Sequence, residues 1–181
     1  MNHTVFKSLI RNTGKAEIKL VGGSMAPLLQ PDDLVRVTEQ KKMIIGRLYL
    51  IYTEPGQLVL HRLVGIERSR ALFKGDHAKC TDALDCNHVL GEASAIKLKG
   101  LNAWVTVEDF RVNCVCAQLS REIGALFEKR GAAYTFRRKQ LCHILDSVNY
   151  ARRRVWELSA ACFDALPKEN GGNNDSYNTK N

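Results

Sequence analysis

The sequence predicts a mainly β fold followed by a C-terminal α-helical extension. In the first part, short apolar or alternating segments are separated by turns that contain glycine and proline, which is typical of antiparallel sheets. Further along, apolar residues recur at helical spacing, as at Ile123 and Leu126. The last residues are too polar to bury a core, so we expect them to be disordered. We therefore divide the chain into a β domain (1–112), a basic helical extension (113–166) and a tail (167–181).

The β domain is expected to begin with a short amphipathic helix, because apolar residues between 3 and 12 have near-helical spacing before Gly14. Alternating or apolar segments predict strands at 17–21, 34–37, 46–53, 58–66, 71–73, 89–98 and 102–107. The turn dipeptide Pro55-Gly56 predicts that the third and fourth strands form a hairpin. Residues 77–88 are expected to form a loop.

The composition limits the cell compartment and the partners. Hydrophobic residues make up 45% of the chain, enough for a packed core, yet no apolar run approaches the ~20 residues that span a bilayer. The N-terminus lacks the apolar region and cleavage site of a secretory signal. We therefore expect a cytoplasmic protein without a transmembrane segment. The net charge of +8 is modest, and without a helix-turn-helix or RNA-binding signature no nucleic-acid partner is expected.

The six cysteines are expected to be reduced, because disulfides belong to exported proteins and no export signal is present. The one cluster of metal-ligand residue types is His77, Cys80, Cys86 and His88. Its spacings do not match those of zinc sites, in which paired ligands lie two to four residues apart. We therefore expect neither a metal nor a cofactor.

The stretch from Gly22 to Asp33 carries the main chemical signal. It places Ser24 after two glycines, which permit close backbone approach, and before the apolar residues Met-Ala-Pro-Leu-Leu. It is not a Gly-x-Ser-x-Gly elbow, because position 26 is Ala. His61 follows in an apolar segment, and aspartates come after it. Serine, histidine and aspartate are the residues of nucleophilic acyl transfer: nucleophile, general base and orienting carboxylate.

Five stretches follow, in order, the pattern of the signal peptidase I family: GGSMAPLLQPDDLVRV, IGRLYLIY, LVLHRLVGIE, FKGDHAKCTD and VLGEASAIKLKG. The resemblance covers residues 15–107 and is closest to anchor-free members that carry His where bacterial leader peptidases carry a catalytic Lys. It implies a coiled antiparallel β-sheet peptidase core. It also implies a serine endopeptidase that cleaves an extended peptide or precursor protein after small residues.

The same resemblance assigns roles to individual residues. Ser24 is the expected nucleophile and His61 the general base. Backbone N–H groups at Gly23 and Ser24 are the expected oxyanion donors, because Gly22 occupies the position where bacterial enzymes carry a second serine hydroxyl. Met25, Pro27 and Leu28 are expected to line the substrate groove, in which the family binds an extended peptide as an added strand.

Three aspartates are candidates for the carboxylate that orients His61. The resemblance, counted from Gly75-Asp76, favours Asp82. Asp76 belongs to a Gly-Asp turn and is the structural alternative, in which it holds the loop and Arg62 in place. Asp85 is the third candidate.

Two other readings remain open, and the basic extension lacks an assigned role. A LexA-like self-cleaving regulator would use Ser and Lys, but no lysine lies in the His61 segment and no DNA-binding module precedes the β domain. A peptide-binding module without activity is the second alternative. The extension has nine Lys or Arg against five Asp or Glu between residues 113 and 166. It is either a solvated amphipathic face or a contact surface for an acidic partner or a membrane.

Overall fold

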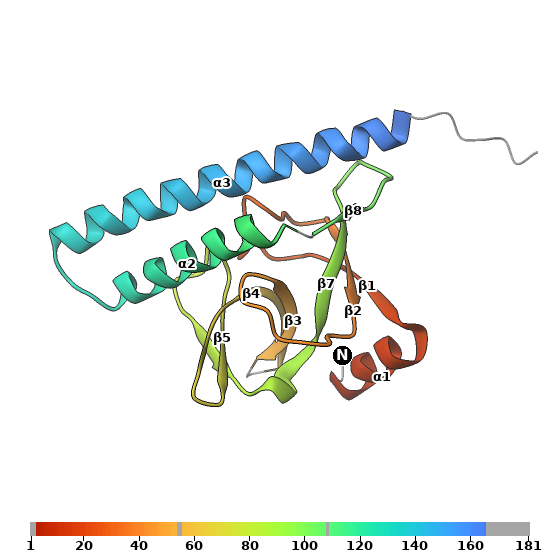
Figure 1. Cartoon of the computed structure of the whole chain (residues 1–181), viewed down its shortest axis with the longest axis horizontal. Helices are drawn as coiled ribbons and strands as arrows, with labels where there is room; N and C mark the ends of the chain where they lie inside the picture. The colour runs from red at the N-terminus through yellow and green to blue at the C-terminus, as the bar shows by residue number, and fades with distance from the viewer. Residues whose placement is uncertain (1–2, 54–55, 108, 166–181) are drawn as a thin grey trace, which may run out of the picture.

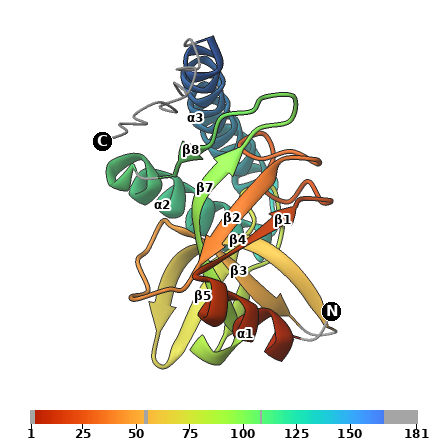
Figure 2. The ribbon, with the colours of Figure 1, turned by 90° about the vertical axis from the view of Figure 1, so that its right-hand side faces the viewer.

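A computed structural model describes residues 3–53, 56–107 and 109–165. One curved antiparallel sheet forms the β core, with helix α1 (His3–Thr13) at one end and two long helices, α2 (Phe110–Phe127) and α3 (Ala132–Ala165), across the other (Figure 1). A view from the side shows the strands curling around a common interior (Figure 2). The predicted fold class, a mainly β core with a C-terminal helical extension, is therefore confirmed.

The sheet contains eight strands, all paired antiparallel: β1 (Lys15–Lys19), β2 (Leu34–Thr38), β3 (Leu48–Thr53), β4 (Gln57–Glu67), β5 (Arg70–Lys74), β6 (Asp82–Leu84), β7 (Val89–Lys97) and β8 (Val105–Thr106). Their order is β1-β2-β7-β3-β4-β5-β6, and β8 adds to β7. Register shifts interrupt the β2–β7, β3–β7 and β4–β5 pairs. Such bulges bend strands and increase their twist, which helps the sheet to curl.

The strand predictions differ from the structure mainly in two places. The expected loop at 77–88 contains β6 and a 3₁₀ turn at Cys86–His88. β6 forms because it pairs with the outer edge of β5, whose backbone groups would otherwise lack partners. The expected strand at 102–107 is reduced to β8, which pairs with β7 through two residues.

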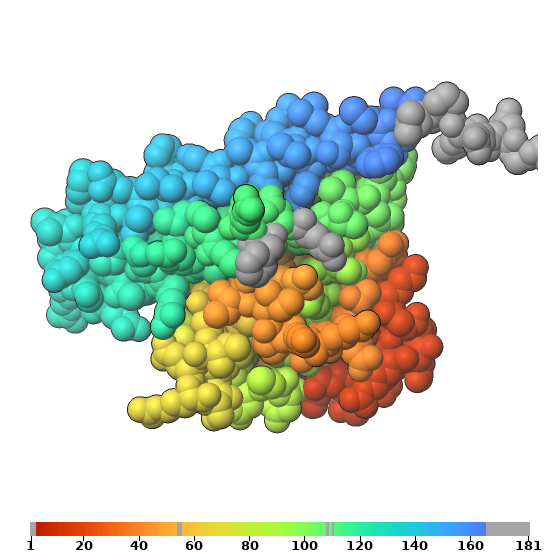
Figure 3. Space-filling model, in the orientation of Figure 1, coloured from red at the N-terminus to blue at the C-terminus, as the bar shows by residue number. Residues whose placement is uncertain are grey.

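The helices α2 and α3 form an antiparallel hairpin that turns at Gly131, whose φ of 117° favours glycine. They pack through a small apolar cluster that includes Cys116, Ile123 and Leu145. Both helices begin earlier than the apolar periodicity suggested. In α2, the Asp109 side chain caps the N-terminus by accepting a hydrogen bond from the Val112 N–H. The helical layer lies directly against the β core (Figure 3). The expected tail at 167–181 lies outside the described residues.

The main core cluster joins the sheet to α1 and to the loop between β1 and β2. Phe6 and Ile10 of α1 and Leu28 and Leu29 of that loop are buried in it, and Trp156 of α3 closes it from the other side. Within the described ranges, no helix has the length and apolar character required to cross a membrane.

Candidate active site

Ser24, His61 and Asp82 form one continuous chain of side-chain contacts. The Ser24 Oγ lies 3.2 Å from His61 Nε2, and His61 Nδ1 lies 3.1 Å from Asp82 Oδ2. His61 is 7% exposed and Ser24 is half-buried. If Nδ1 carries the proton and donates to Asp82, Nε2 is left to accept the Ser24 proton. The structure thus brings the expected nucleophile, base and first-choice carboxylate together in that order.

Three separate elements supply these side chains. Ser24 lies in the loop between β1 and β2 (residues 20–33, the serine loop), His61 in the centre of β4, and Asp82 at the start of β6. In the β5–β6 register Asp82 lies opposite Phe73, which brings it to the His61 side of the sheet. The short strand β6, which the sequence pattern did not predict, therefore positions the carboxylate.

Gly75 is required because the backbones approach closely at this point. A Cβ added there would lie 2.7 Å from the Ser24 carbonyl oxygen and 2.9 Å from His61 Nε2. The His77 N–H also donates to the Ser24 carbonyl over 2.8 Å. The turn after β5 therefore holds the serine loop against His61.

Asp76 has a different environment from Asp82. Its carboxylate is fully buried and accepts hydrogen bonds from Arg62 Nε (2.9 Å) and Nη2 (2.5 Å), and from Asn149 Nδ2 (2.9 Å). Burial alone would lower the pKa of Arg62, but the adjacent Asp76 carboxylate raises it above the ordinary value. These partners fit the structural role that was the alternative for Asp76.

Asp85 does not contact His61. Asp85 is exposed. Its only described hydrogen bond is one that its backbone carbonyl accepts from the His88 N–H. Among the three candidate aspartates, only Asp82 lies within hydrogen-bond distance of the imidazole.

Three polar side chains of α3 contact residues of the β core or of α2. Asn149 donates to Asp76, as described above, and Arg152 donates to Asn113 Oδ1 over 2.7 Å. Arg153 Nη1 donates to Asp33 Oδ2 over 2.6 Å and to the Leu28 carbonyl over 3.2 Å. Burial, together with Arg62, lowers the pKa of Arg152 to about 10. The basic extension thus uses two of its arginines for internal contacts rather than as a solvated face.

These residues were not predicted from the sequence, although a signal was present. Residues 145, 149, 152, 156 and 160 recur at helical spacing and all are buried. The stripe begins with Leu145 and ends with Trp156 and Ala160, so the asparagine and arginine within it are polar residues at positions that face the core. Buried polar groups need partners, and such an interruption indicates a specific contact.

Lys74, the last residue of β5, is a buried lysine close to the site. It is 0% exposed, and its Nζ donates to the Gly75 carbonyl over 3.0 Å. Burial lowers its pKa, and nearby Asp76 offsets part of that effect. In the described part of the chain, the side-chain hydrogen bond of Ser24 goes to His61 and not to this lysine.

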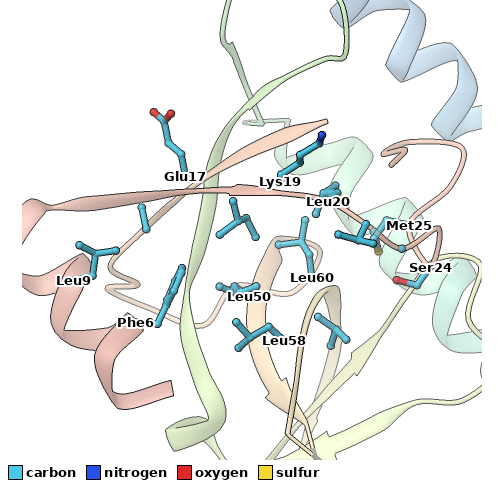
Figure 4. A pocket seen from close by; sticks show the side chains of 15 residues that line it. Phe6, Leu9, Glu17, Lys19, Leu20, Ser24, Met25, Leu50, Leu58 and Leu60 are labelled. Atoms are coloured by element: carbon cyan, nitrogen blue, oxygen red, sulfur yellow. The ribbon is translucent and has the colours of Figure 1, made fainter. Parts of the chain in front are cut away.

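A groove of about 480 Å³ runs from α1 to Ser24 (Figure 4). Phe6, Leu50, Leu58 and Leu60 form apolar walls, and the residues from β1 through Gly22 form one side. β1 is the terminal strand of the sheet, so no strand of the described residues pairs with its outer edge. An extended peptide can pair with such an edge.

The three residues expected to line the groove lie in three different places. Met25 lines the groove together with Ser24. Leu28 does not, because its side chain is fully buried in the core cluster. Pro27, which follows a cis peptide bond, lines a different cavity next to α3. The sequence pattern cannot distinguish these cases, because side chains in a loop do not point inward and outward at regular intervals.

The two glycines before Ser24 leave open space. A Cβ added at Gly22 or Gly23 would meet nothing within 4 Å, and neither glycine has a positive φ. Their role is therefore not to relieve a clash within this chain. The absence of side chains here leaves the backbone next to Ser24 accessible to a ligand.

The six cysteines are free. Across residues 3–53, 56–107 and 109–165, no group of three or more His, Cys, Asp or Glu side chains is arranged to hold a metal ion. No protein-family model matches the chain, and no curated protein matches it.

Proposed function

We propose that the protein is a serine endopeptidase of the signal peptidase I type, with Ser24 as nucleophile, His61 as general base and Asp82 as the orienting carboxylate. The observation that carries the proposal is the contact chain of these three side chains at the end of a groove with a free strand edge. The ordered sequence resemblance over residues 15–107 supports the same assignment.

The geometry fits the steps of acyl transfer. Ser24 Oγ attacks the carbonyl carbon of the scissile bond while its proton passes to His61 Nε2, and the carbonyl electron pair moves onto the oxygen. The imidazolium, stabilised by Asp82, then donates this proton to the leaving nitrogen as the C–N bond breaks. A water that gives its proton to His61 hydrolyses the remaining ester and restores Ser24. Backbone N–H groups at Gly23 and Ser24 would stabilise the oxyanion, each contributing ~3–4 kcal/mol.

The substrate we propose is an extended peptide segment of a cytoplasmic precursor protein. It would pair with the outer edge of β1 and lay its apolar side chains against Leu50, Leu58 and Leu60. The preference for small residues before the scissile bond comes from the family resemblance. The groove alone supports an apolar, extended ligand.

The test is incubation of a synthetic peptide library, randomised around a fixed Ala-x-Ala segment, with the wild type and with Ser24→Ala, followed by mass spectrometry. We expect cleavage by the wild type only, with unchanged melting temperature in the variant. A library that is bound but never cleaved would instead identify a peptide-binding module without activity. Equal cleavage by both proteins would contradict the role of Ser24.

A further inference from the structure

A second cavity begins where the groove ends. The groove lining stops at Ser24 and Met25, whereas Ala26 and Pro27 line a separate cavity of about 410 Å³. Its other walls are His77 and one face of α3. The His77 backbone holds the Ser24 carbonyl, so this cavity adjoins the candidate nucleophile. Figure 4 shows α3 beyond the Ser24 end of the groove, away from α1.

The α3 wall of this cavity carries an unpaired carboxylate. Asp146 is half-buried, and it has no ion pair or hydrogen bond with any described residue. Each of the other partly or fully buried carboxylates in the described ranges has a basic partner: Asp32, Asp33, Asp76, Asp82, Glu92, Glu122 and Glu157. This carboxylate is partly solvated and unpaired, so it is free to pair with a cation that a ligand brings into the cavity.

The remaining lining suits a long basic side chain. His77 lines the cavity together with His143 and Tyr150 of α3, and no lysine or arginine does. A tyrosine ring can attract an ammonium or guanidinium group and pack against its alkyl stem. An acidic ligand would instead be repelled by Asp146.

We propose that this cavity binds the substrate residues that follow the scissile bond, and that it accepts a lysine or arginine side chain there, paired with Asp146. This inference rests on the proposed function, because it takes the peptide to cross Ser24 from the groove. We expect the peptide to pair with β1 and to present the carbonyl of its scissile bond to Ser24. Its next residues then pass beyond Ser24, where the adjoining cavity is formed by Pro27, His77 and α3. The helical extension would then take part in selecting the substrate.

The first experiment measures binding without catalysis. Ser24→Ala protein is immobilised and exposed to synthetic peptides with a fixed Ala-x-Ala segment and randomised positions after it. We expect enrichment of lysine and arginine over glutamate by about fivefold at one of the first positions after the segment, which is what a partly exposed ion pair provides. Adding Asp146→Asn should abolish the enrichment, and Asp146→Lys should favour glutamate. Glu128→Gln, which removes an exposed carboxylate elsewhere, is the charge-matched control and should leave it intact.

The second experiment measures cleavage of the same library by proteins with an intact Ser24. The same preference among cleaved peptides, lost in Asp146→Asn, supports the inference and the proposed function together. Enrichment by Asp146 with no cleavage would retain this binding site and contradict the peptidase. Cleavage that ignores the residue after the bond, with no effect of Asp146→Asn on binding, would overturn the inference and leave the peptidase standing.

Discussion

Arg62 donates hydrogen bonds to both carboxylate oxygens of Asp76. Each of the two residues is next in sequence to a residue at the candidate active site. Arg62 follows His61 in β4, and Asp76 follows Gly75, whose backbone lies against Ser24. Both side chains are fully buried. The ion pair therefore fixes the distance between the strand that carries the base and the turn that holds the serine loop.

The first prediction concerns this pair. Asp76→Asn leaves the Arg62 guanidinium buried beside a neutral amide, and breaking a buried pair costs about 3–5 kcal/mol. We expect a lowered free energy of unfolding in a denaturant titration. Asp85→Asn, which removes an exposed carboxylate from the neighbouring loop, should change it by less than about 0.5 kcal/mol. Equal stability of the two variants would show that the pair does not hold the fold together.

The second prediction separates Asp82 from Asp76. Asp82 is 35% exposed at its side chain and contacts His61 from the rim of the site, so its loss should cost little stability. Asp82→Asn should lower single-turnover cleavage by ~10²–10⁴, because the amide neither fixes the imidazole tautomer nor stabilises the imidazolium. Peptide affinity should be unchanged. Normal turnover in this variant would remove Asp82 from the proposed machinery.

The third prediction uses the buried Lys74. Burial lowers the pKa of Lys74 in the folded state. As the pH rises toward the ordinary value of 10.5, Lys74 is therefore protonated more often in the unfolded chain than in the folded one. Stability of the wild type therefore rises with pH in that window through this group. In Lys74→Met the group is absent, so the wild type should gain stability relative to the variant between pH 7 and pH 10 in denaturant titrations. A pH-independent difference would mean that Lys74 titrates alike in both states.

The sequence was informative where one pattern determines one structure. Alternation and turn residues gave the antiparallel core, and the hairpin of β3 and β4 formed as Pro55-Gly56 predicted. The order of motifs placed Ser24 and His61 in one site, and the geometry now brings Asp82 to them. Whether these residues catalyse a reaction stays a prediction.

The rest depended on contacts distant in sequence. Asn149 and Arg153 lie more than 70 residues from their partners Asp76 and Asp33, and no local periodicity encodes such pairs. β6 is a strand because β5 offers it an edge, which is a property of the assembled sheet. The directions of Pro27 and Leu28 follow from how the serine loop packs, so residue type alone could not assign them to the groove or the core.

The last prediction tests whether the helical extension supports the serine loop. Arg153 ties α3 to both Asp33 and the Leu28 carbonyl, whereas its neighbour Arg154 is half exposed and its described partner is Glu157 on the same helix. Arg153→Met keeps the length of the side chain but leaves Asp33 buried without its cation, so we expect a loss of about 3 kcal/mol in unfolding free energy. Arg154→Met removes the same charge from the next position and should cost less than about 1 kcal/mol.

Activity distinguishes support of the loop from general stability. At a temperature where both variants are fully folded, cleavage by Arg153→Met should fall while that by Arg154→Met stays at the wild-type level, because only the first variant frees the Leu28 end of the serine loop. Asp33→Asn combined with Arg153→Met should recover part of the stability, because position 33 then carries no unpaired charge. It should not recover the activity, because the Leu28 carbonyl still lacks its contact with α3. If Arg153→Met is destabilised yet cleaves at the normal rate, α3 stabilises the fold without positioning Ser24.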